Sequence, residues 1–240
     1  MSGSFYKYVS SIFNVPTTLR IMGILEDAAI EAVVKEIGKL IPREKTNRHF
    51  RSEHFVGDWS GIALYSADGK SKTMRRALKG AYKPTEKLNN LPQTAQMLDT
   101  LKMFGGLQRV RILKVSPGTH VKYHIDLGET VRFGIARLHI PIITNSDCKI
   151  VLNGQQHTWA EGELWYGDFS QPHELWNAGK TDRYHLVIDI KLNAQGLNIF
   201  PIDFIKPNIW QKFGIFVNQF TCVSKNRELK GFLINKIRGI

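Results

Sequence analysis

The chain has 240 residues, 42% of them hydrophobic and 22% charged, and a formal net charge of +12 at pH 7. This length and composition are typical of a globular protein with one sizeable core. There is no run of about 18 apolar residues, and residues 1–10 lack the apolar stretch of a signal peptide, so we expect neither a membrane span nor secretion. The only cysteines are Cys148 and Cys222, which predicts neither a disulfide framework nor a zinc knuckle and favours a reducing, cytoplasmic location.

The positive charge lies mainly on the two flanks of the chain. Residues 106–195 carry 10 Lys or Arg and 9 Asp or Glu, whereas residues 1–105 carry 16 and 10, and residues 196–240 carry 7 and 2. A nucleic-acid-binding module would interleave basic and aromatic residues on one continuous face. Because the basic residues are dispersed, we interpret them as a solvated surface and expect no nucleic-acid partner. An acidic partner or an anionic substrate stays open.

The N-terminal part predicts two helices and one strand. Apolar residues at a spacing of three to four predict an amphipathic helix over residues 25–41, which Pro42 ends. A second helix is expected over residues 93–104, before Gly105 and Gly106. Between them, residues 59–66 are rich in strand formers and are flanked by turn residues, which predicts one short strand.

From Gln108 onward the pattern changes to short β-rich runs separated by turn residues, and Asn153-Gly154 is a strong hairpin signal. After Asn193 the chain turns irregular and basic, with a short helix expected over residues 226–237. We therefore predict a single mainly β domain with flanking helices: an N-terminal flank (1–105), a jelly-roll or double-stranded β-helix core (106–195) and a basic C-terminal extension (196–240). The predicted strands of the core are Arg109–Val115, His120–Ile125, Val131–Ile143, Cys148–Leu152, Gln156–Trp159, Leu164–Tyr166 and Arg183–Leu192.

His124 and Asp126 form an HxD motif at the end of a predicted strand. Side chains two residues apart in a strand face the same side, so this imidazole and carboxylate can converge on one ion. His173 follows a turn-rich stretch and is placed to supply a third ligand. Two imidazoles and one carboxylate leave three octahedral positions open, as in non-haem Fe(II) oxygenases. In a chain with eight His a lone HxD is a weak signal, so further features must support it.

Three polar residues on predicted strands add such support. Arg183 begins the last strand, with His185 and Asp189 on the same face; its planar guanidinium suits the distal carboxylate of 2-oxoglutarate, and a surface arginine is the alternative. Arg137 and His139 share one face of an otherwise apolar strand. If that face points into the barrel, buried charge needs a partner and an anionic ligand is expected there; a solvated face is the alternative.

Several motifs occur together over residues 108–193, about a third of the chain. In order and spacing they resemble the aspartyl/asparaginyl β-hydroxylase family, and the resemblance does not extend to the two flanks. The motifs are Pro117-Gly118-Thr119-His120-Val121, His124, Arg137-Leu138-His139, Cys148-Lys149-Ile150, Thr158-Trp159-x-Glu161-Gly162, His173-Glu174-x-Trp176 and Arg183.

The resemblance implies a dioxygenase that uses Fe(II), 2-oxoglutarate and O2 to hydroxylate an unactivated C–H of an amino acid or amino-acid-containing small molecule, releasing succinate and CO2. It implies that His124 and His173 bind iron, and that His139 and Arg183 hold 2-oxoglutarate with Arg137 in the same site. Family members that act on EGF-like domains have glycine where this chain has Asp126. The carboxylate resembles the bacterial proline-hydroxylase-like members, supports a three-ligand site, and argues against an EGF-type substrate and against halogenation.

Four further residues are candidates for substrate contact: Trp59, His120, Arg132 and Trp176. Structural roles are the alternatives, because Trp59 would also pack on the barrel, His120 would close the Pro-Gly turn, and Arg132 would face away from Arg137 by strand parity. A solvated loop is the favoured interpretation of the polar run 48–54, and a substrate-facing segment is the alternative.

Two other functions stay open. One is a cupin-like metal-binding protein that isomerises or only binds a ligand, and the other is a peptidyl Asp/Asn hydroxylase. The pair Arg183 and His139 discriminates against the cupin-like function, because a cupin without 2-oxoglutarate has no use for them. The expected partner is a small amino-acid-type substrate.

Overall fold

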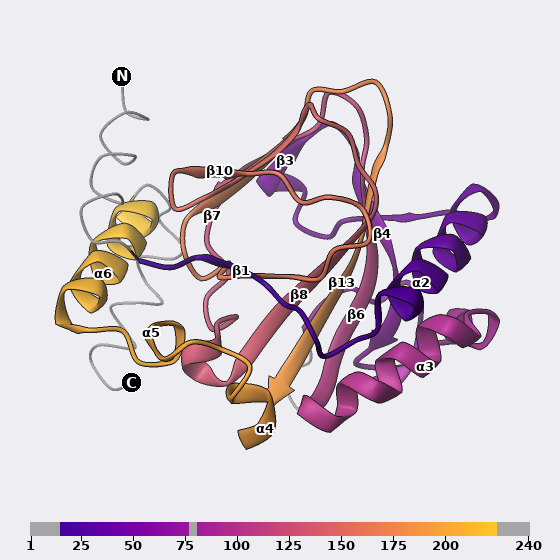
Figure 1. Ribbon diagram of the computed structural model, residues 1–240. Coiled ribbons are helices and arrows are strands. Elements are labelled where there is room, and N and C mark those ends of the chain that lie inside the picture. The colour runs from indigo at the N-terminus through magenta and orange to yellow at the C-terminus, as the bar shows by residue number, and fades with distance from the viewer. Residues whose placement is uncertain (1–14, 77–80, 225–240) are drawn as a thin grey trace.

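The computed structural model describes residues 15–76 and 81–224, and its framework is two antiparallel β-sheets packed as a jelly roll (Figure 1). The larger sheet has the strand order β1-β11-β8-β13-β6-β4-β2, with β5 paired to β4, and the smaller sheet has the order β10-β9-β12-β7-β3. The mainly β jelly roll predicted from the sequence is confirmed. The strands are β1 (Thr18–Arg20), β2 (Asn47–Arg48), β3 (Phe55–Val56), β4 (Trp59–Ser66), β5 (Lys83–Pro84), β6 (Gly105–Val115), β7 (His120–His124), β8 (Ile135–Ile143), β9 (Cys148–Leu152), β10 (Gln155–His157), β11 (Trp165–Gly167), β12 (His173–Asn177) and β13 (Arg183–Leu192).

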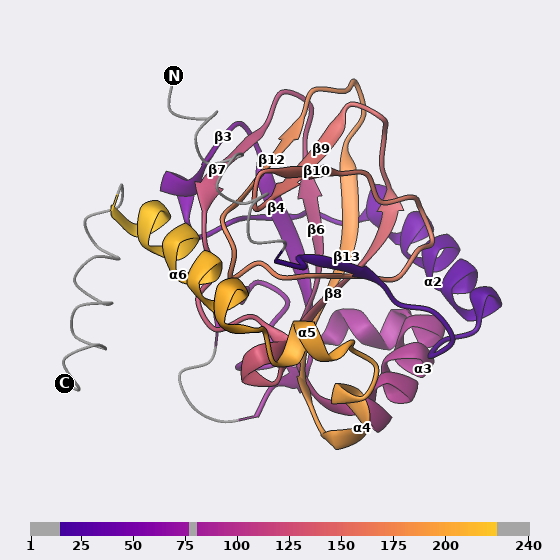
Figure 2. The same cartoon turned by 60° about the vertical axis from the view of Figure 1, so that its left-hand side comes forward.

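Helices flank the two sheets. Figure 1 shows α2 and α3 side by side along the larger sheet, whereas α5 and α6 lie at the opposite side of the molecule, as the turned view in Figure 2 also shows. Among the described residues no helix is long and apolar enough to cross a bilayer. The helices are α2 (Asp27–Leu40), α3 (Pro92–Leu101), α4 (Ala194–Leu197), α5 (Ile202–Ile205) and α6 (Ile209–Ser224); short 3₁₀ turns span Ile41–Arg43, Ser52–His54, Glu86–Asn90, Lys102–Phe104 and Val131–Phe133.

The main hydrophobic core lies between α2, α3 and the outer face of the larger sheet. The apolar stripe of α2 buries Val33 and Ile37, which belong to one cluster with Leu98 of α3 and with Ile112 and Leu186 of the sheet. Because this core occupies the outer face, the inner face of the larger sheet is free to carry polar side chains toward the smaller sheet.

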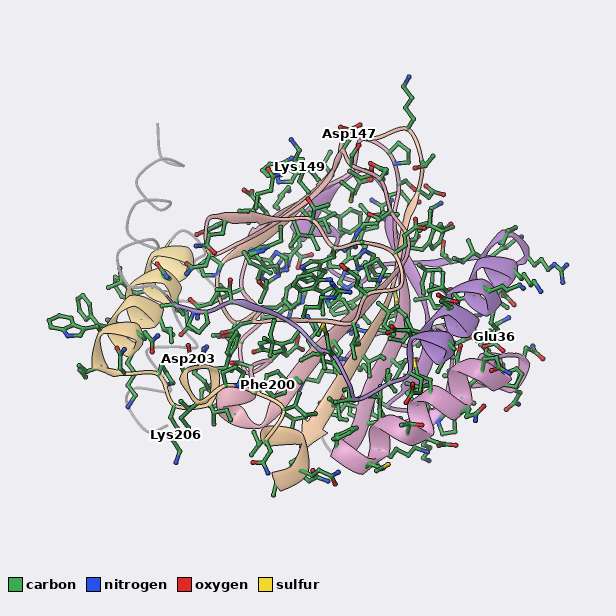
Figure 3. All side chains as sticks on the ribbon, viewed as in Figure 1. Glu36, Asp147, Lys149, Phe200, Asp203 and Lys206 are labelled. Carbon is green, nitrogen blue, oxygen red and sulfur yellow. The ribbon has the colours of Figure 1, made fainter. Side chains whose placement is uncertain are left out.

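A carboxylate on α2 also fixes the start of α3. The two Glu36 oxygens accept hydrogen bonds from the backbone N–H groups of Gln93 and Thr94, at 2.9 and 2.8 Å. These N–H groups have no partner within their own helix, and the helix dipole favours a negative charge there. Figure 3 shows Glu36 on the side of α2 that faces α3.

Two adjacent glycines at the start of β6 offer a matched test of this packing. A Cβ added at Gly105 would lie 2.1 Å from the backbone oxygen of Lys191, whereas a Cβ added at Gly106 would meet nothing within 4 Å. We expect Gly105→Ala to lower the free energy of unfolding by about 1–3 kcal/mol or more, because the clash is with backbone and cannot be relieved by a side-chain rotation. Gly106→Ala should stay within about 0.5 kcal/mol of the wild type. Urea denaturation of both variants checks this, and equal stabilities would contradict it.

Most of the predicted elements are present with shifted ends. The two predicted helices correspond to α2 and to α3 with the 3₁₀ turn that follows it, and the strand over residues 59–66 is β4. The strand predicted over residues 131–143 is shorter, because Val131–Phe133 form a 3₁₀ turn and Gly134 adopts a left-handed φ of 72° before β8 begins. That turn also invalidates the strand-parity argument for Arg132.

Three differences come from tertiary pairing. β12 was not predicted; its central position between β9 and β7 completes the smaller sheet. The N-terminal flank also contributes β1, β2, β3 and β5 to the two sheets, where only one strand was expected. The stretch after Asn193 was expected to be irregular and instead forms α4, α5 and α6. The helix predicted over residues 226–237 lies outside the described residues.

Candidate functional site

A cavity of about 500 Å³ opens between the two sheets. Its walls come from the inner face of the larger sheet, from the smaller sheet, and from the segment between β2 and β3. The larger sheet contributes mainly basic side chains, and the smaller sheet contributes two imidazoles. The lining includes His49, His54, Trp59, Arg109, Arg111, His124, Asp126, Glu129, Arg137, His139, Phe169, His173 and Arg183.

His124, Asp126 and His173 converge in this cavity. Each offers one ligand atom, and the three atoms lie within 4.8 Å of one another. His124 ends β7 and lies opposite His173 at the start of β12. Asp126 lies just beyond the end of β7, where its backbone N–H donates to the carbonyl oxygen of Phe169 at 2.9 Å. Backbone pairing across the smaller sheet therefore brings His173 next to His124 and Asp126, which are close together in the sequence but far from His173.

Backbone carbonyl groups orient both imidazoles of this triad. The Nδ1 atom of His124 lies 2.7 Å from the carbonyl oxygen of Lys122, and that of His173 lies 3.0 Å from the carbonyl oxygen of Gln171. Since a carbonyl only accepts hydrogen bonds, Nδ1 carries the proton and Nε2 keeps its lone pair, the arrangement found in histidines that bind a metal. Burial, together with His124, lowers the pKa of His173 to about 3, so its ring is neutral and available as a ligand.

A network of buried charged side chains adjoins the triad. Asp189 on β13 accepts hydrogen bonds from Arg137 Nε at 2.7 Å, from Arg109 Nε at 2.8 Å and from Arg111 Nη2 at 3.0 Å. Glu129 pairs with both Arg109 and Arg137. The network is directly linked to the triad, because Arg137 Nη1 donates to Asp126 Oδ2 at 2.6 Å.

This network controls the charge of Asp126. Burial alone would raise the pKa of Asp126, but Arg137, His124 and His173 outweigh it and hold the pKa well below its usual range. The carboxylate is therefore ionised at neutral pH, as a metal ligand requires. Two imidazoles and one carboxylate match the donor set of a 2-His-1-carboxylate Fe(II) site.

Arg183 lies in the same cavity and has no anionic partner within residues 15–76 and 81–224. It is 4% exposed, and its Nη2 lies 2.9 Å from His185 Nδ1. Among the described residues no carboxylate lies within ion-pair distance of it, in contrast to Arg109, Arg111 and Arg137. Burial lowers the pKa of Arg183 to about 10, so it remains a cation at neutral pH. A buried cation without a counter-ion indicates a binding site for an anion.

His139 on β8 belongs, like Arg183, to the larger sheet and lines the same cavity. Its ring is 4.9 Å from the Phe169 ring and 5.1 Å from the Trp159 ring, and its Nε2 atom is buried without a hydrogen-bond partner. Burial lowers the pKa of His139 well below its usual range, and Arg183 lowers it further. A neutral imidazole with an unsatisfied nitrogen can hydrogen-bond a ligand that enters the cavity.

The segment between β2 and β4, including part of the polar run 48–54, lines another part of the cavity. His49 stacks on Trp59 at 3.7 Å between ring centroids, and burial with Arg111 lowers its pKa to about 3. The His54 ring lies 4.9 Å from the His124 ring. The favoured interpretation of this run as a solvated loop is wrong for His49 and His54, which line the cavity. The sequence signal for this part of the cavity was the clustering of aromatic and polar residues before β4.

Of the four substrate candidates, Trp59 lines the cavity and the other three do not. His120 and Trp176 stack on each other at 4.1 Å between ring centroids. Arg132 donates to Asp168 Oδ2 and to Ser170 Oγ, both at 2.7 Å, and so anchors the segment that leads to His173.

The cavity contains charged residues that the sequence did not single out. Arg109 and Arg111 alternate along β6 on the face that also carries the cavity, and Asp189 lies opposite Arg137 across β13 and β8. Alternating arginines in an otherwise apolar strand were the available signal for this network. Glu129 lies in a loop and gave no such signal.

Comparison with known proteins places the chain in a family. Residues 27–192 match the family model described as aspartyl/asparaginyl beta-hydroxylase. The chain belongs to this family. The resemblance expected from the motifs is therefore confirmed, and the match extends over α2, α3 and all strands from β2 to β13.

Individual relatives agree with this assignment. The chain is 27% identical over 171 residues to the mouse aspartyl/asparaginyl beta-hydroxylase, covering 70% of this chain and 20% of the mouse protein. It is 29% identical over 194 residues to an L-proline cis-4-hydroxylase of Rhizobium meliloti, covering 78% of this chain and 64% of that protein. The chain thus spans about a fifth of the mouse relative and just under two thirds of the bacterial one.

A solved structure supports the fold. An oxidoreductase of the 2OG-Fe(II) oxygenase family from Burkholderia pseudomallei superposes with a TM-score of 0.50 at 15% sequence identity, covering 80% of this chain and 91% of that one. At this identity the likeness concerns the jelly-roll fold alone.

Proposed function

We propose that this protein is an Fe(II)/2-oxoglutarate-dependent dioxygenase that hydroxylates an unactivated C–H of an amino acid or an amino-acid-containing small molecule. The observation that carries the proposal is the combination, in one cavity, of the His124, Asp126 and His173 triad with the buried cation Arg183, for which the described residues supply no carboxylate partner. Family membership and the L-proline cis-4-hydroxylase relative support a small amino-acid substrate.

In this proposal His124 and His173 bind Fe(II) through Nε2, and Asp126 binds it through a carboxylate oxygen. Arg183 holds the distal carboxylate of 2-oxoglutarate, and His139 donates to or accepts from the same molecule through Nε2. When bound, Fe(II) and 2-oxoglutarate together activate O2, and the cosubstrate leaves as succinate and CO2. The hydrogen bond that Arg137 donates to Asp126 fixes the position and the charge of this carboxylate.

The remaining cavity residues position the substrate and exclude water. Trp59 and His49 form a flat aromatic wall, and His54 lies beside His124. Phe169 and Trp159 pack around His139 and shield the cosubstrate side from solvent. A cupin-like protein without 2-oxoglutarate would leave Arg183 buried without any counter-ion, which is the observation against that alternative. The proposal includes a reducing, cytoplasmic location, in keeping with the buried free thiol of Cys148.

An anaerobic titration tests the cofactor assignment. Wild-type protein with Fe(II) and 2-oxoglutarate is expected to develop the weak visible charge-transfer band of the chelated complex, whereas His124→Ala should lose it, because one of three protein ligands is gone. His157→Ala is the matched control: His157 lies on β10 beside Thr18, outside the cavity lining, and its loss should leave the band unchanged.

The same titration can contradict the proposal. A folded wild-type protein that binds Fe(II) but develops no band with 2-oxoglutarate would exclude this dioxygenase function and favour the cupin-like one. A band that persists in His124→Ala would show that the metal lies elsewhere.

A further inference from the structure

The charges of the cavity do not balance. Seven arginines and three carboxylates line it, and Asp189 lies behind three of the arginines. Under the proposed function Fe(II), Asp126, doubly charged 2-oxoglutarate and Arg183 together carry no net charge. The other buried charges of the site are those of Arg109, Arg111 and Arg137 and those of Glu129 and Asp189. Three positive charges against two negative ones give this group a net charge of +1.

Within this group, Arg111 is the residue whose positive charge a ligand in the cavity can contact. It is 3% exposed, it lines the cavity, and its Nε atom is buried without a hydrogen-bond partner. Within the described ranges its one ion pair is the contact of Nη2 with Asp189, which also binds Arg109 and Arg137. Burial of an incompletely paired guanidinium is costly, so an anionic group of the substrate is expected to complete it.

A second group of cations lies at the edge of the cavity. The guanidinium carbons of Arg51 and Arg75 lie 5.7 and 5.2 Å from the centre of the Phe50 ring, so two segments of chain bring their charges to one aromatic side chain. Arg76 reaches the loop that follows Asp126: its Nη1 would lie 3.5 Å from a Cβ at Gly128. All three arginines line the cavity and are exposed. Among the described residues none of them pairs with a carboxylate.

We propose that the substrate carries a second anionic group besides its amino-acid carboxylate, and that Arg51, Arg75 and Arg76 bind this second group at the edge of the cavity. The inference rests on the proposed function and narrows its substrate class. A neutral amino acid brings one carboxylate and one ammonium group, so it adds no net negative charge to the cavity. An acidic amino acid, or an amino acid that bears a phosphate, matches both the buried and the peripheral excess of positive charge.

Pairs of ligands that differ in charge but hardly in shape test this inference. Isothermal titration calorimetry, under anaerobic conditions with Fe(II) and 2-oxoglutarate present, would compare L-aspartate with L-asparagine, L-glutamate with L-glutamine, and O-phospho-L-serine with L-serine. In at least one pair the acidic member should bind about tenfold more tightly, since several partly exposed arginines converge on the second anionic group. The pair with the larger ratio identifies the second group as carboxylate or phosphate.

Arginine variants test whether Arg51, Arg75 and Arg76 cause the preference for the acidic ligand. The triple variant Arg51→Gln, Arg75→Gln, Arg76→Gln should reduce the ratio within the preferred pair to near one; because the three side chains are exposed, it is expected to fold. Arg43→Gln, an exposed arginine outside the cavity, is the matched control and should keep the ratio.

Two outcomes would overturn the inference: affinities equal within every pair, or a preference that survives in the triple variant. These outcomes are separate from a failure of the proposed function. If the charge-transfer band forms but acidic ligands have no advantage, the dioxygenase assignment stands and only the substrate class is wrong. If the band does not form, the proposed function itself is wrong.

Discussion

Arg183→Met is expected to weaken binding of 2-oxoglutarate strongly while leaving the cofactor-free protein as stable as the wild type or more stable. Arg183 is buried and has no carboxylate partner among the described residues, so without a ligand its charge is a cost to the fold. The pKa of Arg183, which burial lowers to about 10, reflects that cost. Methionine has a similar length and keeps the apolar contacts of the stem.

The expected loss of affinity is large. Removing one partner of a buried, hydrogen-bonded charge pair costs about 2–5 kcal/mol, which corresponds to a loss of roughly 30-fold to several-thousand-fold in the affinity for 2-oxoglutarate. Arg183→Lys should recover only part of it, because an ammonium group cannot form the bidentate contact of a guanidinium.

Calorimetry with 2-oxoglutarate and urea denaturation of the cofactor-free protein would measure the two effects. Arg132→Met is the matched control with the opposite pattern. Arg132 is paired with Asp168 and Ser170 outside the cavity lining, so its loss should destabilise the fold with little direct effect on 2-oxoglutarate affinity. If Arg183→Met bound 2-oxoglutarate as the wild type does, the assignment of Arg183 to the cosubstrate would be wrong.

Asp189→Asn is expected to have the largest effect on stability. Asp189 is 1% exposed and accepts hydrogen bonds from Arg109, Arg111 and Arg137 at 2.7 to 3.3 Å. Asparagine keeps the shape of the side chain but removes its charge, and three buried guanidinium groups lose their shared counter-ion. Breaking a buried ion pair in this way costs about 3–5 kcal/mol, a large part of the free energy that stabilises a typical domain.

Chemical denaturation of Asp189→Asn and of Asp147→Asn would measure this effect. Asp147 is an exposed residue in the turn between β8 and β9, which Figure 3 shows at the edge of the molecule. Its replacement should change the free energy of unfolding by less than about 0.5 kcal/mol. If the two variants were equally stable, the buried network would not contribute to the fold as proposed.

The same carboxylate predicts how stability depends on pH. Burial alone would raise the pKa of Asp189, but Arg137, Arg109 and Arg111 outweigh it and hold the pKa far below its ordinary value of 3.8. A carboxyl whose pKa is lower in the folded state stabilises the fold above its unfolded pKa, and this contribution is lost as the pH falls toward the folded pKa. Wild-type stability should therefore fall below about pH 4, and Asp189→Asn should lack that part of the decline.

The sequence alone determined the fold class and the residues with the strongest local signals. Short β-rich runs between turn residues predict a jelly roll, and the helical spacing over residues 25–41 predicts the helix that is α2. Alternation along a strand also placed Arg183, His185 and Asp189 on one face. These features depend on neighbours within a few residues, where the period of two or 3.6 fixes the direction of each side chain.

Only the tertiary structure decided which of these side chains share a site. Pairing of β12 with β7 places His173 opposite His124, although 49 positions of chain and several strands separate them. The cavity residues His49 and His54 lie between the two-residue strands β2 and β3, and β3 is held in place by pairing with β7, far along the sequence. A two-residue strand such as β2 has too few residues for any periodic pattern.

The network of buried charges around Asp189 also could not be predicted from the sequence. Arg109, Arg111 and Glu129 could each belong to a solvated surface when judged from sequence, because a charged residue carries no sign of whether it is buried. In the structure Arg109 and Arg111 pair with Asp189 on the inner face of the larger sheet, and Glu129 pairs with Arg109. The outer face of that sheet is covered by α2 and α3. Burial and partners are properties of the packed sheets, and they distinguish Arg183, which is buried with no carboxylate partner in the described part of the chain, from Arg109, Arg111 and Arg137.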